Sequence, residues 1–254
     1  MPWNPETYDK FKNLRYQPFF DLANFIQPTE KMKAIDLGCG TGEQTAILAE
    51  KFENAIFLGV DTSIEMLEQS KKLESDRLHF RRSSTEAVID SNEKWDLIFS
   101  NAALQWSKDH KELFPSLIRM LNPGGQFAVQ IPVQKENVLN KILFELVQEE
   151  PFANFLNGWN RPSPVLSMDE YTQLLFDQRL KDIQVIQKVY PLIAQDHQTL
   201  YNFISGSSLI PYLERLEGEQ QDFFIKTYQQ RIAEHFPKLP AIYAFKRLLL
   251  FGRL

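Results

Sequence analysis

Short apolar runs alternate with amphipathic segments along the first half of the chain. The apolar runs predict strands at 32–37, 55–61, 78–82, 95–101 and 126–132, and the segments between them, such as 43–52 and 63–73, have helical spacing. Thr62, followed three residues later by Glu65, predicts a capping box at the start of the second of these helices, and LNPGG predicts a turn before the fifth strand. Strands separated by helices are typical of parallel sheets, because parallel neighbours need a crossover connection. The pattern therefore predicts an α/β fold built on a doubly wound, mostly parallel sheet.

The two ends of the chain depart from this alternation. Apolar positions recur at helical spacing from about 5 to 27, and Pro18 is predicted to split this segment into two helices. After residue 133 the pattern predicts helices and loops, then a sixth strand at 182–193, more helices at 197–236 and a seventh strand at 241–254. We predict one domain over 1–254, with a helical cap at 1–30, a ligand-binding core at 31–133, and a helical substrate cap inserted between the last strands at 134–254.

Composition and charge narrow the class of ligand. The formal net charge of −5 argues against a dedicated nucleic-acid binder, which normally carries a basic face. Cys39 is the single cysteine, so no intramolecular disulfide can form and a reducing compartment fits. The sequence has no signal peptide and no apolar run of membrane-spanning length. We therefore expect a cytoplasmic protein with a small-molecule substrate and neither a nucleic-acid nor a membrane partner.

The stretch AIDLGCGTGEQT at 34–45 holds the clearest binding motif. It places Gly38, Gly40 and Gly42 directly after the first predicted strand, where ligands bind in doubly wound sheets. The spacing differs from a Walker A loop, which has four residues between its glycines and then Gly-Lys-Ser/Thr. It also differs from the G-x-G-x-x-G of dinucleotide sites, and Glu43 would repel a phosphate. The loop therefore suits a ligand without phosphate that approaches the backbone closely.

Asp61 is a second predicted ligand-binding residue, in addition to the glycine loop. It ends the second predicted strand, where its carboxylate can accept hydrogen bonds from both hydroxyls of a ribose. Together with the glycine loop it indicates an adenosine-type ligand, with Cys39 as a small packing residue and not a nucleophile. In the alternative interpretation the glycines only form a turn, and Asp61 caps a helix.

The motifs DLGCGTG, GVD, SSTEA and FSNAALQW together resemble those of class I S-adenosylmethionine-dependent methyltransferases. The N-terminal WNPETYDKF, the stretch FSNAALQW with the following DH and LFP, and the C-terminal AFKRLLLFGR resemble the trans-aconitate 2-methyltransferase family. The resemblance implies a Rossmann-like, seven-stranded fold, S-adenosyl-L-methionine as methyl donor and S-adenosyl-L-homocysteine as product.

The same resemblance implies the cofactor-binding residues. The loop from Asp36 to Gly42 would lie along the methionine part, Asp61 would hold the ribose, and Thr62 and Met66 would lie near the adenine. Ser84 stands where the family commonly has an acid that contacts the adenine amino group, and Asn101 and Ala102 would form a wall beneath the sulfonium. The implied set is Asp36, Gly38, Cys39, Gly40, Gly42, Asp61, Thr62, Met66, Ser84, Thr85, Glu86, Asn101 and Ala102.

Methyl transfer to a carboxylate needs no general base, because a carboxylate is already ionised at neutral pH. The sequence indicates no particular catalytic residue, and its four histidines form no metal motif such as H-E-x-x-H. A carboxylate acceptor would need cationic or hydrogen-bonding partners. The predicted substrate-binding residues are Tyr8, Arg15, Gln105, Trp106, Tyr243 and Arg247.

The favoured function is therefore formation of a methyl ester on a small carboxylic acid, trans-aconitate or a related polycarboxylate. The segment QIPVQKENV departs from the family, which follows Q-M-P with Asp-Asn and a tryptophan. Other acceptors stay open, including a malonyl carrier ester, a carbon or a phenol, as do a non-catalytic S-adenosylmethionine-binding protein and an NAD-dependent oxidoreductase. A nucleic-acid base is disfavoured, because NAALQW replaces the D/N-P-P-Y/F segment of enzymes that methylate bases. Oligomeric state, movement of the cap and use of a base are not fixed by the sequence.

Overall fold

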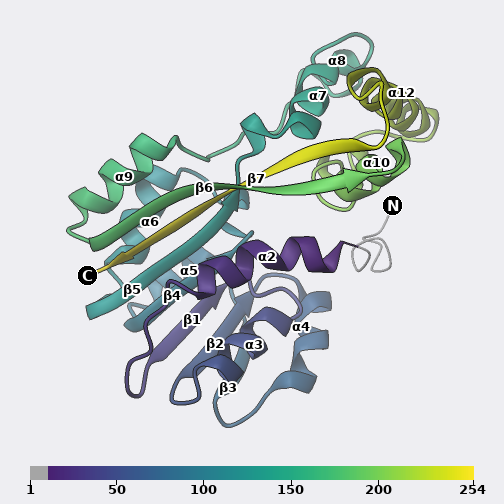
Figure 1. Cartoon of the computed structure of the whole chain (residues 1–254). Helices are drawn as coiled ribbons and strands as arrows, with labels where there is room; N and C mark the ends of the chain where they lie inside the picture. Colours follow the sequence, from purple (N-terminus) through teal and green to yellow (C-terminus); the bar gives the residue numbers. More distant parts are fainter. Residues whose placement is uncertain (1–10) are drawn as a thin grey trace. The chain divides into compact units, whose positions relative to one another are not determined.

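The computed structural model describes residues 11–254, in which seven strands form one sheet of order β3-β2-β1-β4-β5-β7-β6 (Figure 1). Their bounds are β1 (Lys33–Leu37), β2 (Ile56–Asp61), β3 (Leu78–Arg82), β4 (Trp95–Asn101), β5 (Leu121–Pro132), β6 (Lys181–Ala194) and β7 (Ala241–Arg253). Strands β1 to β5 pair in parallel with their neighbours, whereas β7 pairs antiparallel with β5. The predicted α/β fold with a mostly parallel, seven-stranded sheet is confirmed.

The chain divides into two compact units. The sheet unit contains residues 18–132, 164–188 and 247–254, and the second unit contains residues 11–17, 133–163 and 189–246. The boundaries fall inside α2 (Lys12–Ala23), β6 and β7, so each of these elements contributes residues to both units. The predicted division into caps and core stays a prediction.

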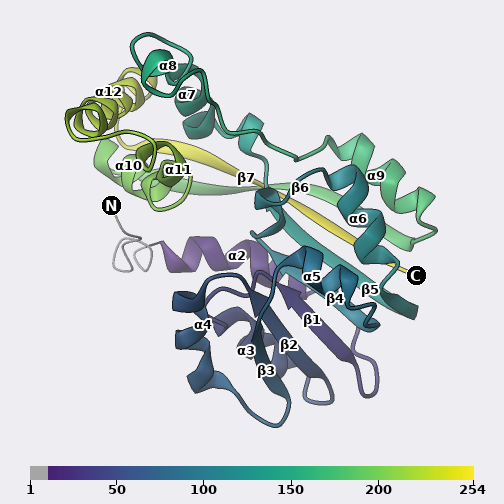
Figure 2. The same cartoon turned by 180° about the vertical axis from the view of Figure 1, so that it is seen from behind.

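In the sheet unit, helices cover both faces of the sheet (Figure 2). The Phe19 ring of α2 packs edge-on against Phe99 of β4, at a centroid distance of 5.8 Å. Phe114 of α6 (His110–Ile118) packs against Phe127 on the opposite face, at 5.3 Å. The remaining helices of this unit are α3 (Glu43–Lys51), α4 (Ile64–Ser70), η1 (Lys71–Leu73), α5 (Thr85–Asp90), η2 (Leu104–Trp106) and α9 (Met168–Asp177). Burial on both faces explains why these strands read as continuous apolar runs.

The second unit has a separate aromatic core. Phe203, Tyr212, Phe224, Tyr228 and Tyr243 are buried in it, and the Tyr228 hydroxyl donates to the Leu139 carbonyl at 2.8 Å. Its helices are η3 (Gln134–Glu136), α7 (Val138–Leu146), α8 (Phe152–Phe155), α10 (His197–Ser205), α11 (Ile210–Leu213) and α12 (Glu219–His235). This confirms the predicted helical segment at 197–236.

Three local predictions were wrong. Pro18 lies inside the continuous helix α2, where Pro18, Phe19 and Leu22 are buried; this burial offsets the missing amide hydrogen bond. Helix α4 is capped by Ser63 and not by Thr62, because the Ser63 hydroxyl accepts from Met66 N. The Asp61 carboxylate accepts from the Ser63 amide and holds Ser63 in this position. The predicted turn LNPGG belongs to β5, because Gly124 and Gly125 bond to the backbone of Leu254.

Candidate functional site

The glycine loop crosses the carboxyl end of β2. The amides of Gly38 and Cys39 both donate to the Val60 carbonyl, at 2.8 and 3.0 Å, and the loop closes when Gly42 N donates to Cys39 O at 3.0 Å. Helix α3 begins at the next residue, Glu43. The loop is therefore fixed by backbone hydrogen bonds at the edge of the sheet where the parallel strands end.

Asp61 joins the end of β2 to this loop. One carboxylate oxygen, Oδ2, accepts from Gly40 N at 2.9 Å, and the other, Oδ1, accepts from Ser63 N at 2.9 Å. A carboxylate has about four acceptor positions, so it can still accept from two ligand hydroxyls. The structure brings together the two halves of the predicted adenosine site.

Two glycines of the loop have different surroundings. Gly42 has a φ of +78°, and a Cβ atom there would lie 2.5 Å from the Phe80 ring and 2.8 Å from Ser70 Cβ. Gly40 has a φ of +56°, but no protein atom lies within 4 Å of the place where its Cβ would be. Gly42 is therefore required by packing, whereas the space beside Gly40 is open to a ligand.

Buried ionisable groups lie beneath the loop. Burial raises the pKa of the Asp36 carboxyl from 3.8 to about 7; the hydrogen bond from the Thr45 hydroxyl, at 2.6 Å, lowers this pKa, and the charge of Asp61 adds to the rise. Burial also raises the pKa of the Cys39 thiol, so the thiol stays protonated. This supports Cys39 as a packing residue, as the sequence predicted.

The residues predicted near the adenine lie at the ends of β2 and β3. Ser83 N donates to the Asp61 carbonyl at 3.0 Å, and Arg82 Nε donates to the Thr62 carbonyl at 3.2 Å. Ser84 caps α5, because its hydroxyl accepts from Ala87 N at 3.1 Å. The segment that contains Ser84, Thr85 and Glu86 therefore starts next to Asp61, while Met66 lies in the first turns of α4.

At the end of β4, Asn101 donates from Nδ2 to Gln44 Oε1 of α3, at 2.9 Å. Its other amide atom, Oδ1, is buried and has no hydrogen-bond partner in the part of the chain that the structure describes. Such an acceptor is costly to bury unless a ligand supplies a donor. Ala102 follows with a φ of +57°, and its amide donates to Gln130 O at 2.9 Å. Sequence reasoning missed Gln44, whose role appears only when α3 is placed beside β4.

His110 contacts the segment after β4 and fixes its position. Gln105 is buried and donates from Nε2 to Ala102 O at 2.6 Å, whereas Trp106 is 50% exposed and is no core residue. The His110 ring contacts Leu104 O through Nε2, at 2.9 Å, and the Tyr171 hydroxyl through Nδ1. Burial lowers the pKa of His110, which favours the neutral ring. A neutral ring that donates from Nε2 and accepts at Nδ1 satisfies both contacts, so His110 positions the loop that carries Gln105.

The other predicted substrate residues divide between the two units. In the second unit, Arg15 donates from Nη2 to Phe203 O at 2.7 Å, and Phe203 packs edge-on against Tyr243 at 5.6 Å, so Arg15 and Tyr243 share one neighbour. Arg247 belongs to the sheet unit, where it pairs with Pro132 of β5. Tyr8 lies outside the described residues.

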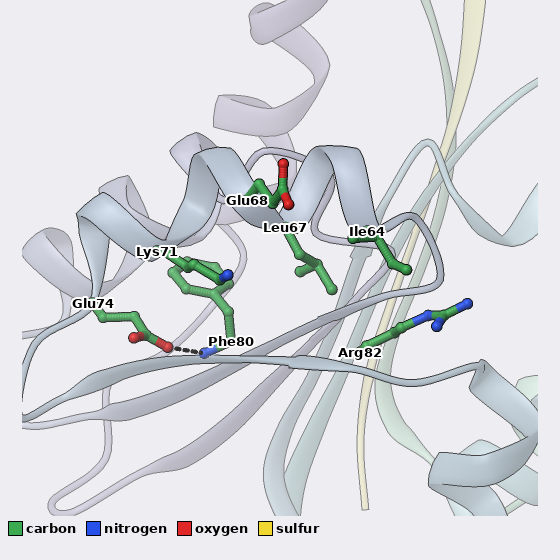
Figure 3. A pocket seen from close by; sticks show the side chains of 7 residues that line it. All are labelled: Ile64, Leu67, Glu68, Lys71, Glu74, Phe80 and Arg82. Atoms are coloured by element: carbon green, nitrogen blue, oxygen red, sulfur yellow. Dashed lines mark hydrogen bonds between the residues drawn. The ribbon is translucent and has the colours of Figure 1, made fainter.

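A groove of about 400 Å³ lies between α4 and β3 in the sheet unit (Figure 3). Glu74 of its rim accepts from Phe80 N at 3.3 Å. Its lining consists of Ile64, Leu67, Glu68, Lys71, Glu74, Phe80 and Arg82. This lining includes none of the residues predicted to hold the cofactor, but it adjoins them, because Arg82 donates to Thr62 O and the Phe80 ring packs beside Gly42. Within residues 11–254, no cluster of His, Cys, Asp and Glu could hold a metal ion.

Comparison with known proteins decides the family. Residues 28–193 match the family described as a methyltransferase domain. The chain is also 37% identical to a trans-aconitate 2-methyltransferase of Deinococcus radiodurans, over 98% of this chain and 97% of the relative. The chain belongs to the trans-aconitate 2-methyltransferase family. It is therefore an S-adenosylmethionine-dependent methyltransferase, as its motifs predicted.

Solved structures agree with the fold of a methyltransferase. The YcgJ protein of Bacillus subtilis superposes with a TM-score of 0.58 at 17% identity, over 94% of this chain and 98% of that one. Phosphoethanolamine N-methyltransferase 2 of Haemonchus contortus, solved with S-adenosyl-L-methionine, gives a TM-score of 0.56 at 16% identity, over 93% of this chain and 52% of that one. Within residues 11–254, no helix has both the length and the apolar character needed to cross a bilayer.

The residues of this chain fit S-adenosylmethionine, the cofactor of the family. The space beside Gly40 admits a ligand next to the backbone, and Asp61 keeps acceptor capacity for ribose hydroxyls. The unpartnered acceptor of Asn101 suits a ligand that carries an N–H donor, such as an amino group.

Proposed function

We propose that this protein transfers the methyl group of S-adenosylmethionine to a carboxylate of trans-aconitate or a related polycarboxylate, forming a methyl ester. The observation that carries this proposal is the full-length identity of 37% with a trans-aconitate 2-methyltransferase. The relative covers both the cofactor core and the two ends of the chain, where most of the predicted acceptor residues lie.

In this methyl transfer, the main task of the protein is to position the two reactants. When bound, S-adenosylmethionine supplies a methyl group on a cationic sulfur; a carboxylate oxygen bonds to that carbon while the carbon–sulfur bond breaks and its electron pair stays on sulfur. No proton moves, so no general base is needed. Holding two reactants in line can supply much of the acceleration. The residues of the site therefore need to bind, orient and exclude water.

The cofactor side of the proposal rests on the edge of the sheet near β1 and β2. Asp61 would hold the ribose while it also fixes Gly40, and Asn101 would face the methionine part. Thr62, Met66, Ser84, Thr85 and Glu86 would surround the adenine. Ser84 already caps α5 with its hydroxyl, so a direct hydrogen bond to the adenine is not required of it.

In the sheet unit, Gln105, Trp106 and Arg247 would contact the acceptor. Arg15 and Tyr243 of the second unit, and Tyr8, stay candidates from the sequence alone. The half-exposed indole of Trp106 supports a role as an apolar wall, because a ring of that size is otherwise costly to leave in water. Arg247 offers the planar donor pair that carboxylates accept best.

Asp61→Ala should weaken binding of S-adenosylhomocysteine by about 1.5–3 kcal/mol, the usual loss for hydrogen bonds to a charged group. The change removes the ribose acceptor and the partner of Gly40 N together. Calorimetric titration measures the dissociation constant. The control is Asp90→Ala, which removes an exposed carboxylate at the end of α5. Equal affinity of the Asp61 variant and the wild type would show that the ribose lies elsewhere.

An acceptor screen tests the reaction itself. The protein is incubated with S-adenosylmethionine carrying a labelled methyl group and a panel of mono-, di- and tricarboxylates. We expect a labelled ester from a polycarboxylate, with trans-aconitate among the best acceptors, and hydrolysis of that ester in alkali. Tight cofactor binding without any labelled product would instead favour a non-catalytic binding protein.

A further inference from the structure

We propose that Gln130 of β5 binds a carboxylate of the acceptor acid, beside Arg247. This inference rests on the proposed function and extends it to a residue outside the predicted substrate-binding set. It is carried by a buried amide without a partner and by the register of three neighbouring strands.

The Gln130 side chain is only 1% exposed, and its Nε2 has no hydrogen-bond partner among the residues that the structure describes. Gln126 lies four residues earlier on the same strand and is also 1% exposed. Its amide is fully used: Oε1 accepts from Gln27 N at 2.8 Å, and Nε2 donates to Gln27 O at 2.7 Å. Hydrogen bonds within the folded protein therefore satisfy the buried side-chain amide of Gln126, but they leave Nε2 of Gln130 without a partner.

The strand register shows what surrounds Gln130. It pairs with Asn101 of β4 on one side and with Leu249 of β7 on the other, while Pro132 pairs with Arg247. Paired residues project to the same face of a sheet, and so do residues two apart on one strand. Asn101, Gln130 and Arg247 therefore share one face. The diagonal separation of Gln130 and Arg247 is about 7–8 Å, within reach of long side chains.

An amide N–H beside a guanidinium is a suitable site for a carboxylate. Both groups donate hydrogen bonds, and a buried donor regains its lost solvation when an anionic oxygen accepts from it. The same carboxylate chemistry could come from the cofactor's methionine part or from the acceptor. The cofactor residues Asp36, Asp61 and Asn101 lie on β1, β2 and β4, on one side of Gln130. Arg247, which would share the carboxylate with Gln130, lies on β7, on the side away from those strands. We therefore assign the acceptor as the source.

The test compares Gln130→Leu with the matched control Gln126→Leu. For Gln130→Leu we expect the KM for the best polycarboxylate to rise roughly 10- to 100-fold, as for a lost hydrogen bond to a charged group. The dissociation constant for S-adenosylhomocysteine should stay at the wild-type value. The melting temperature without ligands should stay equal or rise, because an unpartnered amide is replaced by an apolar group. Gln126→Leu should lower the melting temperature and leave KM unchanged.

Three outcomes would overturn the assignment. An unchanged KM in Gln130→Leu would remove the residue from the site. Weaker S-adenosylhomocysteine binding with an unchanged KM would mean that Gln130 serves the cofactor. A loss of melting temperature like that of Gln126→Leu, with an unchanged KM, would mean that its amide pairs within the protein, with Asn101 as the nearest candidate. These results are distinct from failure of the proposed function, in which the wild type itself methylates no acid.

Discussion

Replacing Gly42 by alanine should destabilise the protein by roughly 2–6 kcal/mol, the combined cost of a strained backbone and of overpacking. The new methyl group would lie 2.5 Å from the Phe80 ring, and the φ of +78° disfavours any side chain. The Phe80 ring has little room to move away, because it also packs against Gly59. A Cβ atom at Gly59 would lie only 2.6 Å from the ring. Urea unfolding measures the loss.

Gly40→Ala is the matched comparison. It should cost only about 1–2 kcal/mol of stability, because a left-handed φ is its only penalty and its Cβ would meet no protein atom. The methyl group would instead occupy the space beside the loop and weaken S-adenosylhomocysteine binding by at least about tenfold, or 1.4 kcal/mol. A folded Gly40→Ala protein with wild-type affinity would show that the cofactor does not pass this residue.

Asp36→Asn should stabilise the protein at pH 8.5 by an amount on the order of 4 kcal/mol, which corresponds to a pKa raised from 3.8 to about 7. In the folded protein the carboxyl keeps its proton at pH values where the unfolded chain has already released it. The contribution of Asp36 to stability is therefore fully present below pH 4, is lost as the pH rises to about 7, and is constant above that. Asparagine removes this ionisation and can still accept from the Thr45 hydroxyl.

The measurement is the free energy of unfolding at pH 5 and at pH 8.5, for the wild type and the variant. The gain from Asp36→Asn should be about two to three times larger at pH 8.5 than at pH 5. Asp90→Asn, at an exposed position, controls for the loss of one negative charge. A gain that is equal at both pH values would contradict a protonated Asp36 in the folded protein near neutral pH. The substitution should also weaken cofactor binding if the ionised carboxylate interacts with the cationic cofactor.

The features that sequence predicted best are those fixed by local chemistry. The strands from 32 to 132 follow from apolar runs buried on both faces, and the glycine loop with Asp61 follows from the position at which parallel strands end. The joining of Gly40 to Asp61 is a consequence of that topology. The start of α4 was misplaced by one residue because Thr62 and Ser63 are both good caps, and a tertiary contact, Asp61 to Ser63 N, selects Ser63.

The role of Gln130 was harder to predict, because an identical residue on the same strand has a different, structural role. Gln126 and Gln130 are two buried glutamines on one face of one strand, and only the backbone of Gln27 distinguishes them. Nothing near Gln130 in the sequence indicates that its amide has no partner. His110 is similar, since its role depends on Tyr171, which is distant in the sequence. Such contacts are long-range, and periodicity carries no information about them.

The antiparallel pairing of β5 with β7 has a consequence for biosynthesis. Strand β5 ends at Pro132, but the segment that covers its free edge begins at Arg247, so that edge stays open while the ribosome translates everything between them. An open apolar edge is a template for pairing with other chains. We therefore expect nascent chains stalled before residue 247 to depend on chaperones, and shortening the chain within 247–254 to lower the soluble yield more than its few residues would suggest.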